Sequence, residues 1–353
     1  VTQRTDYANV TLTGASKTIP AGTITLSKTL TINSGATYNG ATNPVLNVGG
    51  NFSNSGTFVQ GTGLLTFNGA GAQTISGSTA TAFNDVTISN TAAAVSASTN
   101  VSVATSKTFT VSAGAILSPD SGIVVSGLGT LTGNGTAQVK RARGTSDYLN
   151  QYTIANKTLT NLTIEMVGAA EQGLAATTFG GLKINNSNGI ALAGDVTVNG
   201  TLTLSGGNIT TGSSKVIVSS TGSVSRTSGH VIGALQKNVA TGSNVARTFE
   251  VGASDNYRPI DVTFASVSGA GDLVGTVSTT AGDHPNISTS SLNAAKTVNR
   301  YWRMTNGGIT FTNYDAVFHF VAGDIDAGSN TADFIVRKFD SPNWSSGATG
   351  TRT

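Results

Sequence analysis

Cysteine is absent from this chain of 353 residues. The absence excludes a disulfide framework, and it excludes thiolate nucleophiles and thiolate metal sites. It does not exclude an extracellular location, because extracellular proteins can fold without disulfides.

Charge is also scarce. Charged residues make up 10% of the chain, against roughly 25% in an ordinary soluble domain. The net charge of +3 comes from 20 basic and 17 acidic residues, and the only tight basic cluster is Lys140, Arg141 and Arg143, where we expect a solvated turn. Since no Lys/Arg stripe is present to hold a phosphate backbone, we predict no nucleic-acid partner.

Long apolar runs are missing as well. No stretch of about 18 apolar residues occurs, so no transmembrane segment is predicted. The sequence has no signal peptide, starts with Val1, and has only Met166 and Met304 as methionines. We therefore expect a processed product or a segment of a longer protein.

Short runs in which apolar residues alternate with Ser or Thr fill the first two thirds of the chain. Such alternation, bounded by Gly, Asn and Ser, is typical of strands with one buried face. No window of eleven residues has helical spacing, so we predict an all-β protein. The predicted strands include Val10–Leu12, Ile24–Leu26, Leu65–Phe67, Val86–Ile88, Val101–Val103 and Val196–Val198.

One nine-residue unit occurs three times, as TLTINSGAT at Thr29, TFTVSAGAI at Thr108 and TLTLSGGNI at Thr201. In addition, FNDVTISN at Phe83 matches FGGLKINN at Phe179. Repeats built from short strands indicate either a parallel β-helix or a sandwich.

The unit favours the β-helix for residues 1–228, because it combines two inward apolar residues with a corner glycine that tolerates positive φ. The Asn-Gly pairs at Asn39, Asn68 and Asn199 keep antiparallel hairpins open as the alternative. The expected inward pairs are Leu30/Ile32, Phe109/Val111 and Leu202/Leu204, and the expected corners are Gly35, Gly114 and Gly207.

The composition changes near His230, where aromatic and charged residues become more frequent. The strands lengthen there, and Pro259 stands at the start of one of them, where a missing N–H is tolerated. We predict an antiparallel β-sandwich over residues 229–353. Its expected strands are Arg258–Phe264, Val298–Met304, Ala316–Val321 and Asp333–Lys338.

Several segments resemble large, repeat-rich, adhesin-like surface proteins of bacteria that use the type IX secretion route. The resemblance rests on FNDVTISN, DVTVNGTLTLSGGNITTGSSKVIV, HVIGALQKNV, FEVGASDNYRPIDVTF and RYWRM. It implies secretion and display on the cell surface, and it implies a β-sandwich module with a further strand after the Trp344 region. That strand would come from continuing sequence or from a neighbouring chain.

An enzyme on a β-helix needs clustered carboxylates on successive coils. The carboxylates of the repetitive region are isolated in sequence, so we predict no enzyme, and a polysaccharide-degrading activity is the least favoured alternative. The residues considered are Asp85, Asp120, Glu165, Glu171 and Asp195.

Calcium is the best metal candidate, although no cofactor is otherwise expected. Asp324, Asp326 and Asn330 in GDIDAGSN could supply oxygen ligands from one loop. The competing interpretation is an Asp/Gly/Asn turn between two strands. The three histidines, His230, His284 and His319, have no zinc-type spacing, and we expect His319 to be solvated.

These observations predict a structural extracellular protein on the bacterial cell surface, a fibre or stalk subunit with an adhesive or self-assembly role. Open coil ends predict end-to-end self-association. The alternative is a carbohydrate-binding adhesin module that stacks surface glycans on Tyr301, Trp302 or Trp344. The competing interpretation of these three aromatic residues is that they fill the sandwich core.

Overall fold

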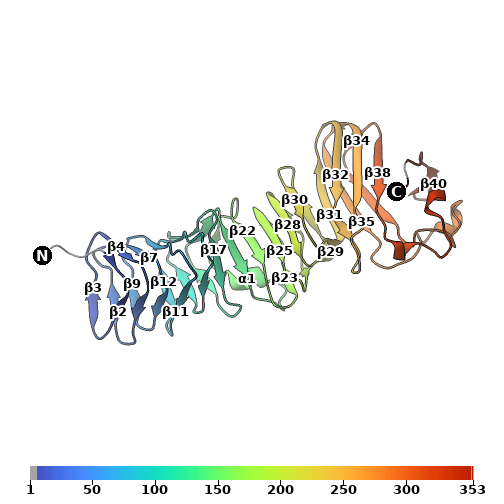
Figure 1. The fold of residues 1–353 in the computed structure, drawn as a ribbon. Helices are drawn as coiled ribbons and strands as arrows, with labels where there is room; N and C mark the ends of the chain where they lie inside the picture. Colours follow the sequence, from blue (N-terminus) through green and yellow to red (C-terminus); the bar gives the residue numbers. More distant parts are fainter. Residues whose placement is uncertain (1–5, 351, 353) are drawn as a thin grey trace. The chain divides into compact units, whose positions relative to one another are not determined.

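The computed structural model describes residues 6–350 and residue 352, and Figure 1 shows their fold. A parallel β-solenoid of about twelve turns covers residues 6–252, and mixed and antiparallel sheets follow it. The predicted all-β fold, a solenoid followed by antiparallel sheets, is confirmed. The chain divides into two compact units, Val1–Ser214 with Thr221–Gly229 and Lys215–Ser220 with His230–Thr353.

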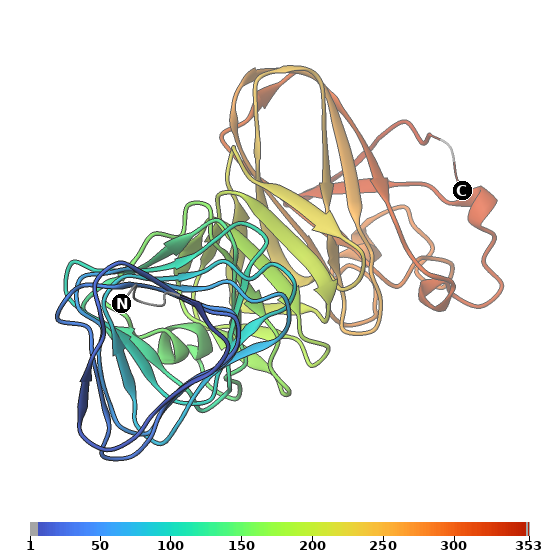
Figure 2. The ribbon, with the colours of Figure 1, turned by 60° about the vertical axis from the view of Figure 1, so that its left-hand side comes forward.

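Three faces form each N-terminal coil, as the view in Figure 2 shows for the coils nearest the N-terminus. The first face, in spatial order, is β1 (Asp6–Tyr7), β4 (Thr23–Leu26), β7 (Val45–Val48), β10 (Leu65–Phe67), β13 (Val86–Ile88), β16 (Thr108–Val111), β19 (Thr130–Gly133) and β21 (Asn156–Lys157). The second is β2 (Val10–Leu12), β5 (Leu30–Ile32), β8 (Phe52–Asn54), β11 (Gln73–Ser76), β14 (Val95–Ala97), β17 (Ile116–Pro119), β20 (Thr136–Val139), β22 (Thr163–Met166), β25 (Gly181–Asn185), β28 (Thr201–Gly206) and β30 (Ser223–Arg226).

Shorter sheets close the remaining side. The first holds β3 (Ser16–Thr18), β6 (Thr37–Asn39) and β9 (Thr57–Val59), and the next holds β12 (Thr81–Phe83), β15 (Val101–Val103) and β18 (Val125–Gly127). Further along the chain come β23 (Gln172–Leu174), β24 (Thr177–Phe179), β26 (Ile190–Leu192), β27 (Val196–Val198) and β29 (Ile209–Val218).

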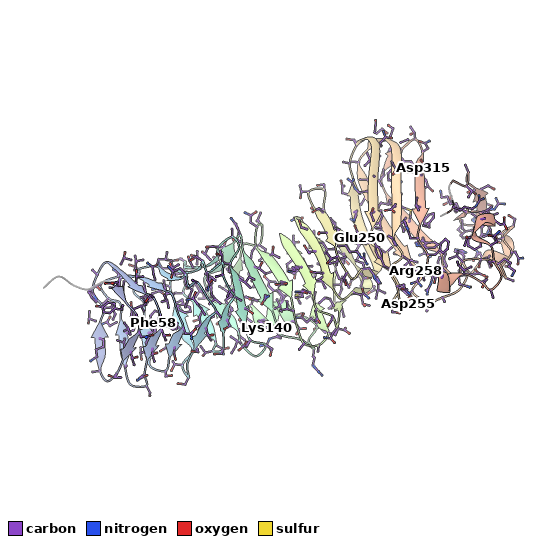
Figure 3. All side chains as sticks on the ribbon, in the orientation of Figure 1. Phe58, Lys140, Glu250, Asp255, Arg258 and Asp315 are labelled. Carbon is purple, nitrogen blue, oxygen red and sulfur yellow. The ribbon has the colours of Figure 1, made fainter. Side chains whose placement is uncertain are left out.

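In-register parallel pairing stacks like residues into columns along the solenoid. On the first face, for example, Leu65 pairs with Val86 and Val86 with Phe109, and all three side chains are fully buried. Phenylalanines fill the interior of the early coils, and the ring of Phe83 lies 6.4 Å from that of Phe109. Phe58, labelled in Figure 3, packs 6.0 Å from Phe83. Apolar burial and the ladder hydrogen bonds therefore reinforce each other in every coil.

The predicted inward residues and corners are confirmed. All six inward side chains are at most 1% exposed, and Gly35, Gly114 and Gly207 have φ angles of 75°, 77° and 74°. Parallel pairing throughout the second face overrules the antiparallel alternative, and the Asn-Gly pairs lie at coil corners. The three copies of the repeat do not share one face, because β5 and β28 belong to the second face and β16 to the first.

A buried glutamine fastens three coils together at one corner. Gln73 Nε2 donates to the carbonyl oxygens of Val48, at 2.8 Å, and Gly50, at 2.6 Å. Its Oε1 accepts from Gly69 N, at 2.8 Å, and from Asn90 Nδ2, at 3.1 Å. The amide thus satisfies backbone groups that the corner removes from the ladders.

The same arrangement recurs about one hundred residues later. Gln172 Nε2 donates to the carbonyl oxygens of Val139, at 2.9 Å, and Arg141, at 2.6 Å. Its Oε1 accepts from Gly168 N, at 2.8 Å, and from Asn186 Nδ2, at 3.0 Å. We call these two arrangements the glutamine brackets.

An insertion interrupts the coil between β20 and β22 and carries the helix α1 (Asp147–Gln151). Tyr148 and Tyr152 are buried, and the Tyr152 hydroxyl donates to the carbonyl oxygen of Gln138 at 2.8 Å. The sequence did not predict this helix, because five residues are too few to establish a helical period.

The C-terminal unit contains β31 (Val231–Val239), β32 (Gly242–Phe249), β33 (Val251–Gly252), β34 (Ile260–Gly269), β35 (Gly271–Val277), β36 (Trp302–Gly307), β37 (Thr310–Phe311), β38 (Tyr314–Phe318), β39 (Arg337–Asp340) and β40 (Asn343–Ser346), with the 3₁₀ turns η1 (Ile287–Thr289), η2 (Ala322–Asp324) and η3 (Thr331–Asp333). β31 pairs in antiparallel with β35, and β35 pairs in the same way with β36. β34 pairs in antiparallel with β32, β37 and β38.

One expectation for the C-terminal region needs correction. The division between the two compact units falls between Gly229 and His230, beside the predicted boundary, while parallel pairing continues as far as β33, which pairs with β31. The strand expected at Asp333–Lys338 is wrong in its first half, since η3 occupies Thr331–Asp333 and β39 begins at Arg337. Asn330 caps η3 by accepting from Ala332 N, which favours a turn at this point.

Candidate functional site

Lysines on neighbouring coils neutralise three of the carboxylates considered for catalysis. These carboxylates are isolated from one another in sequence, but each of the three has a lysine about one coil away. The pairs are Asp85–Lys107 at 2.9 Å, Asp120–Lys140 at 3.3 Å and Glu165–Lys183 at 2.9 Å. Glu171 and Asp195 are exposed on other coils.

Glu165 is the most deeply buried of these carboxylates, with 5% of its side chain exposed. It accepts from Gln138 Nε2 at 2.8 Å and from Asn185 Nδ2 at 3.0 Å, besides its ion pair with Lys183. Burial alone would raise its pKa, but these hydrogen bonds and the lysine charge hold the pKa below its ordinary value. Glu165 is therefore an anion at neutral pH, with its acceptor sites already in use.

A shallow depression of about 430 Å³ opens beside this network. Asp120, Gln138, Lys140 and Val167 line it, and Figure 3 labels Lys140. Its donors and acceptors are bound mainly to one another, because Lys140 pairs with Asp120 and Gln138 bonds to Glu165. The two charged side chains of this lining, Asp120 and Lys140, are therefore paired with each other.

Asp324, the first predicted calcium ligand, lies at the centre of a buried ionic cluster. Its Oδ2 accepts from Arg258 Nε at 2.7 Å, and its Oδ1 accepts from Arg300 Nε at 3.0 Å. Arg258 also binds Asp255 at 2.8 Å, and Figure 3 shows these two residues side by side. Burial alone would raise the pKa of Asp324, but the arginine hydrogen bonds lower it below its ordinary value.

The other two predicted ligands engage separate partners. Asp326 accepts from Thr297 N at 2.8 Å and from Asn299 Nδ2 at 2.7 Å, and Asn330 caps η3. No group of three or more His, Asp or Glu residues in the described part of the chain is arranged to hold a metal ion. The calcium site stays a prediction, and the two guanidinium groups on Asp324 count against that carboxylate as a ligand.

The aromatic residues of the glycan alternative fall into two separate clusters. The rings of Tyr301 and Trp344 lie 5.1 Å and 5.2 Å from the ring of His284. Trp302 stacks on Phe318 at 5.3 Å instead. Each of the three alternative platform residues thus already packs against another aromatic ring.

The remaining histidines have ordinary structural contacts. His230 is buried, and its Nε2 lies 2.6 Å from the carbonyl oxygen of Ala253. His319 is about half exposed, as expected, and its Nε2 lies 2.7 Å from Asp261 Oδ2.

The glutamine brackets are the interactions that sequence reasoning missed. Their signal is a glycine four residues before the glutamine, as in Gly69–Gln73 and Gly168–Gln172. A Cβ on Gly168 would lie 2.6 Å from Cδ of Gln172, so the side chain needs a glycine there. The matched FNDVTISN and FGGLKINN segments end on the two asparagines, Asn90 and Asn186, that complete the brackets.

Edge strands mark where the solenoid sheets end. β1, β2 and β3 each pair with a following strand on one side only, and β30 pairs only with β28, within residues 6–350. Among these same residues, no helix has the length and apolar character needed to cross a membrane.

Comparison with known proteins identifies no relative: no family model, no curated protein and no solved structure matches the chain.

Proposed function

We propose that the protein is a structural component of the bacterial cell surface, in which the solenoid serves as a stalk. The observation that carries this proposal is the second solenoid face, an uninterrupted parallel sheet of eleven strands from β2 to β30. Ten steps of about 4.8 Å give this sheet a length of about 48 Å. The hydrogen bonds between its strands run along the stalk. The number of stacked strands therefore sets the length of the stalk.

The outward side chains support a structural role. Hydroxyls form rows between coils, as where Thr74 Oγ1 lies 3.0 Å from Ser96 Oγ. The lysine–carboxylate pairs cancel charge between neighbouring coils, which gives the stalk little long-range electrostatic pull on charged ligands. A surface of this kind is hydrophilic but offers little basis for recognising one particular ligand.

Glycan binding is the alternative role, and end-to-end self-association is a further prediction. Tyr301 and Trp344 already pack on His284, which reduces the ring surface available for stacking a sugar. For this reason we place the stalk role first.

A one-coil deletion tests the stalk role. Phe109 pairs with Val86, which in turn pairs with Leu65, so removing residues 86–108 joins Asp85 to Phe109 in register. We expect intact cells that express either form to bind an antibody against the C-terminal unit equally well, because a spacer tolerates the loss of one repeat. Labelling that appears only after the cells are permeabilised would contradict the surface location. Loss of display with a folded deletion variant would contradict the spacer role.

A further inference from the structure

Three cations stand within four positions of the solenoid sequence, Lys140, Arg141 and Arg143, and we call them the basic corner. Other lysines of the solenoid, such as Lys107 and Lys183, are paired with carboxylates. The side chains of Arg141 and Arg143 have no hydrogen-bond or ion-pair partner within residues 6–350. The basic corner therefore carries two positive charges that no carboxylate of the described chain neutralises.

Two buried amides fix the backbone of the basic corner. Gln151 Oε1 accepts from Lys140 N at 2.8 Å and from Arg141 N at 3.0 Å. Gln172 Nε2, which belongs to the second glutamine bracket, donates to the Arg141 carbonyl oxygen at 2.6 Å. Both glutamines are fully buried. A ligand would thus meet side chains on a backbone that is already ordered, which lowers the entropic cost of binding.

Both arginines carry an unfavourable feature. Arg143 has a φ angle of 72°, in a region that residues other than glycine rarely adopt, and its N–H donates to the carbonyl oxygen of Glu171 at 2.9 Å. Backbone strain of this kind clusters at functional sites. Arg141 Nε is buried without a hydrogen-bond partner, which is also unfavourable. A guanidinium that turned toward a bound anion would satisfy that donor.

Neighbouring carboxylates leave the two arginines available. Asp147 is buried, and it accepts from Gly144 N at 3.1 Å and from Gly173 N at 2.8 Å. Glu171 is exposed, and it forms no ion pair with the part of the chain that the structure describes.

The shallow depression described above adjoins the basic corner, because Lys140 belongs to both. The contact of Lys140 with Asp120 is a partly exposed ion pair at 3.3 Å, and such pairs contribute little stability. Ser121 is exposed, and its hydroxyl has no partner among the described residues. Val167 and Ala169 add apolar surface to the lining. A sugar ring presents hydroxyls and apolar C–H groups, so this lining fits a sugar beside a charged group.

We propose that the basic corner and this depression bind a carboxylated polysaccharide. The guanidinium groups of Arg141 and Arg143 would hold its carboxylates, because a planar guanidinium matches a carboxylate with two parallel hydrogen bonds. Nucleic acid fits less well, since three cations at one corner do not form the stripe that a phosphate backbone requires. The inference goes beyond the stalk role and does not depend on it. The basic corner belongs to the N-terminal unit, whereas the aromatic residues weighed for glycan binding belong to the C-terminal unit.

The test measures binding of the purified chain to immobilised polygalacturonate, a linear polysaccharide with a carboxylate on each sugar, by biolayer interferometry at low ionic strength. The fully methyl-esterified polymer has the same backbone without the charges. We expect the wild-type chain to bind the charged polymer, with an affinity that falls as salt is added, and not to bind the ester. Arg141→Gln/Arg143→Gln should lose at least about tenfold in affinity, because charge-assisted hydrogen bonds are the strong ones.

Two control variants separate this site from general effects of charge and folding. Lys17→Gln/Lys28→Gln removes two exposed cations elsewhere and should retain the wild-type affinity. Arg143→Gly removes one arginine and suits the positive φ angle, so it should keep or raise the melting temperature and still weaken binding. This single variant decides the question if the double variant does not fold.

A wild-type chain that does not bind polygalacturonate would overturn the proposal, and so would a folded double variant with unchanged affinity. Equal binding to the methyl ester would show that the carboxylates are not recognised. Duplex DNA that binds as tightly, and loses its binding in the same double variant, would identify a general polyanion site and overturn the assignment to a polysaccharide. The stalk role is tested separately by cell labelling and by the coil deletion, so the two proposals can fail independently.

Discussion

The solenoid and the C-terminal unit satisfy their buried polar groups in different ways. Each must satisfy polar groups in its interior. Within the N-terminal unit, the solenoid uses the neutral amides of Gln73 and Gln172 and the Asp147 carboxylate, which backbone N–H groups hold, and it keeps its ion pairs on the outward side of the strands. The C-terminal unit buries charge instead: Arg258, Arg300 and Asp324 are 1%, 8% and 2% exposed.

A second buried ion pair of the C-terminal unit follows the same rule. Lys237 and Glu250 lie 2.6 Å apart, and burial lowers the pKa of Lys237 below its ordinary value although Glu250 opposes the shift. Figure 3 labels Glu250. A repeating fold can use the same neutral glutamine bracket to satisfy the backbone groups at two of its corners. The C-terminal unit instead relies on ion pairs, whose stability depends on pH.

The largest effect should come from removing the central carboxylate of the C-terminal unit. Asp324→Ala removes the buried carboxylate that Arg258 and Arg300 share and leaves them only the half-exposed Asp255, and losing one partner of a buried ion pair costs about 3–5 kcal/mol. Both tryptophans, Trp302 and Trp344, lie in this unit, so thermal unfolding followed by tryptophan fluorescence reports on it selectively. Asp340→Ala, which removes an exposed partner of Lys338, should change little. An unchanged thermal unfolding transition in Asp324→Ala would show that the buried ionic cluster does not stabilise the C-terminal unit.

Asp324 also predicts acid sensitivity. Its pKa is lower in the folded state than in the unfolded chain, so the folded state binds its proton less readily. The stabilisation is therefore fully present above the unfolded pKa of about 3.9 and is lost as pH falls through the lower folded value. Fluorescence-detected stability should decline below about pH 4, and Asp324→Asn should flatten this decline.

The next largest effect concerns a glutamine bracket. Gln172→Leu keeps the size of the side chain but removes the side-chain partners of the Arg141 carbonyl oxygen and the Gly168 N–H, and it leaves the Val139 carbonyl oxygen with Val167 N alone. We expect a loss of about 2–4 kcal/mol from the solenoid, since each buried unsatisfied group costs about 1–3 kcal/mol. Far-UV circular dichroism should show the loss at all pH values, while the tryptophan transition should stay in place.

Gln172→Glu sharpens the same point. A carboxylate there would face the carbonyl oxygens of Val139 and Arg141 and would be raised in pKa by burial and by repulsion. A carboxyl group whose pKa is higher in the folded than in the unfolded chain destabilises the folded state at pH values above its unfolded pKa. This destabilisation disappears as the pH falls and the group is protonated. The variant solenoid should thus gain stability in acid, the opposite of the C-terminal unit. A loss in acid would contradict this account.

A smaller effect is expected at the corner glycines. A Cβ on Gly69 would lie 2.4 Å from the Gly49 carbonyl oxygen and 2.8 Å from Gln73 Cδ, so Gly69→Ala should cost about 1–3 kcal/mol. Gly71, two residues later, has open space around its Cβ position and provides the matched control. Equal melting temperatures for Gly69→Ala and Gly71→Ala would show that the bracket tolerates the extra atom.

The smallest effect should come from the outward face. The lowered pKa of Glu165 adds stability above the unfolded pKa of about 4.3, and that stability is lost as pH falls through the folded value. Glu165→Gln should remove part of the solenoid's own acid dependence and shift its midpoint by only a few degrees, about the effect of 1 kcal/mol. A large shift at neutral pH would place this outward network among the principal stabilising contacts.

Much of the solenoid could be predicted because each strand shows its own period. The pairs Leu30/Ile32 and Leu202/Leu204 alternate with Thr, and their corner glycines follow at a fixed distance. The solenoid face on which each copy of the nine-residue repeat lies could not be predicted, since any face accepts two inward apolar residues followed by a corner glycine. The inserted helix α1 and the end of the solenoid at residue 252 also depend on contacts between distant segments.

The C-terminal cluster was harder still to anticipate. Asp324 and Asp326 stand close together in sequence like ligands of one ion, but their hydrogen-bond partners come from different segments. Arg258 lies 66 residues before Asp324, and no local sequence pattern indicates that the two residues pair. The glutamine brackets have a local pattern, Gly-x-x-x-Gln, but the pattern also occurs at Gly56–Gln60, where the glutamine bonds to other partners, so it is a weak signal without the geometry.

Coil stacking also determines how the protein withstands damage. Each coil is held by its two neighbours through backbone hydrogen bonds on several faces, so no peptide bond carries the whole structure. A protease that cuts one exposed corner breaks the chain but leaves those hydrogen bonds in place on both sides of the cut. A nicked molecule would then separate into fragments on a denaturing gel and keep its native size in solution. If the protein works outside the cell, as we propose, such tolerance to cutting would extend its working life.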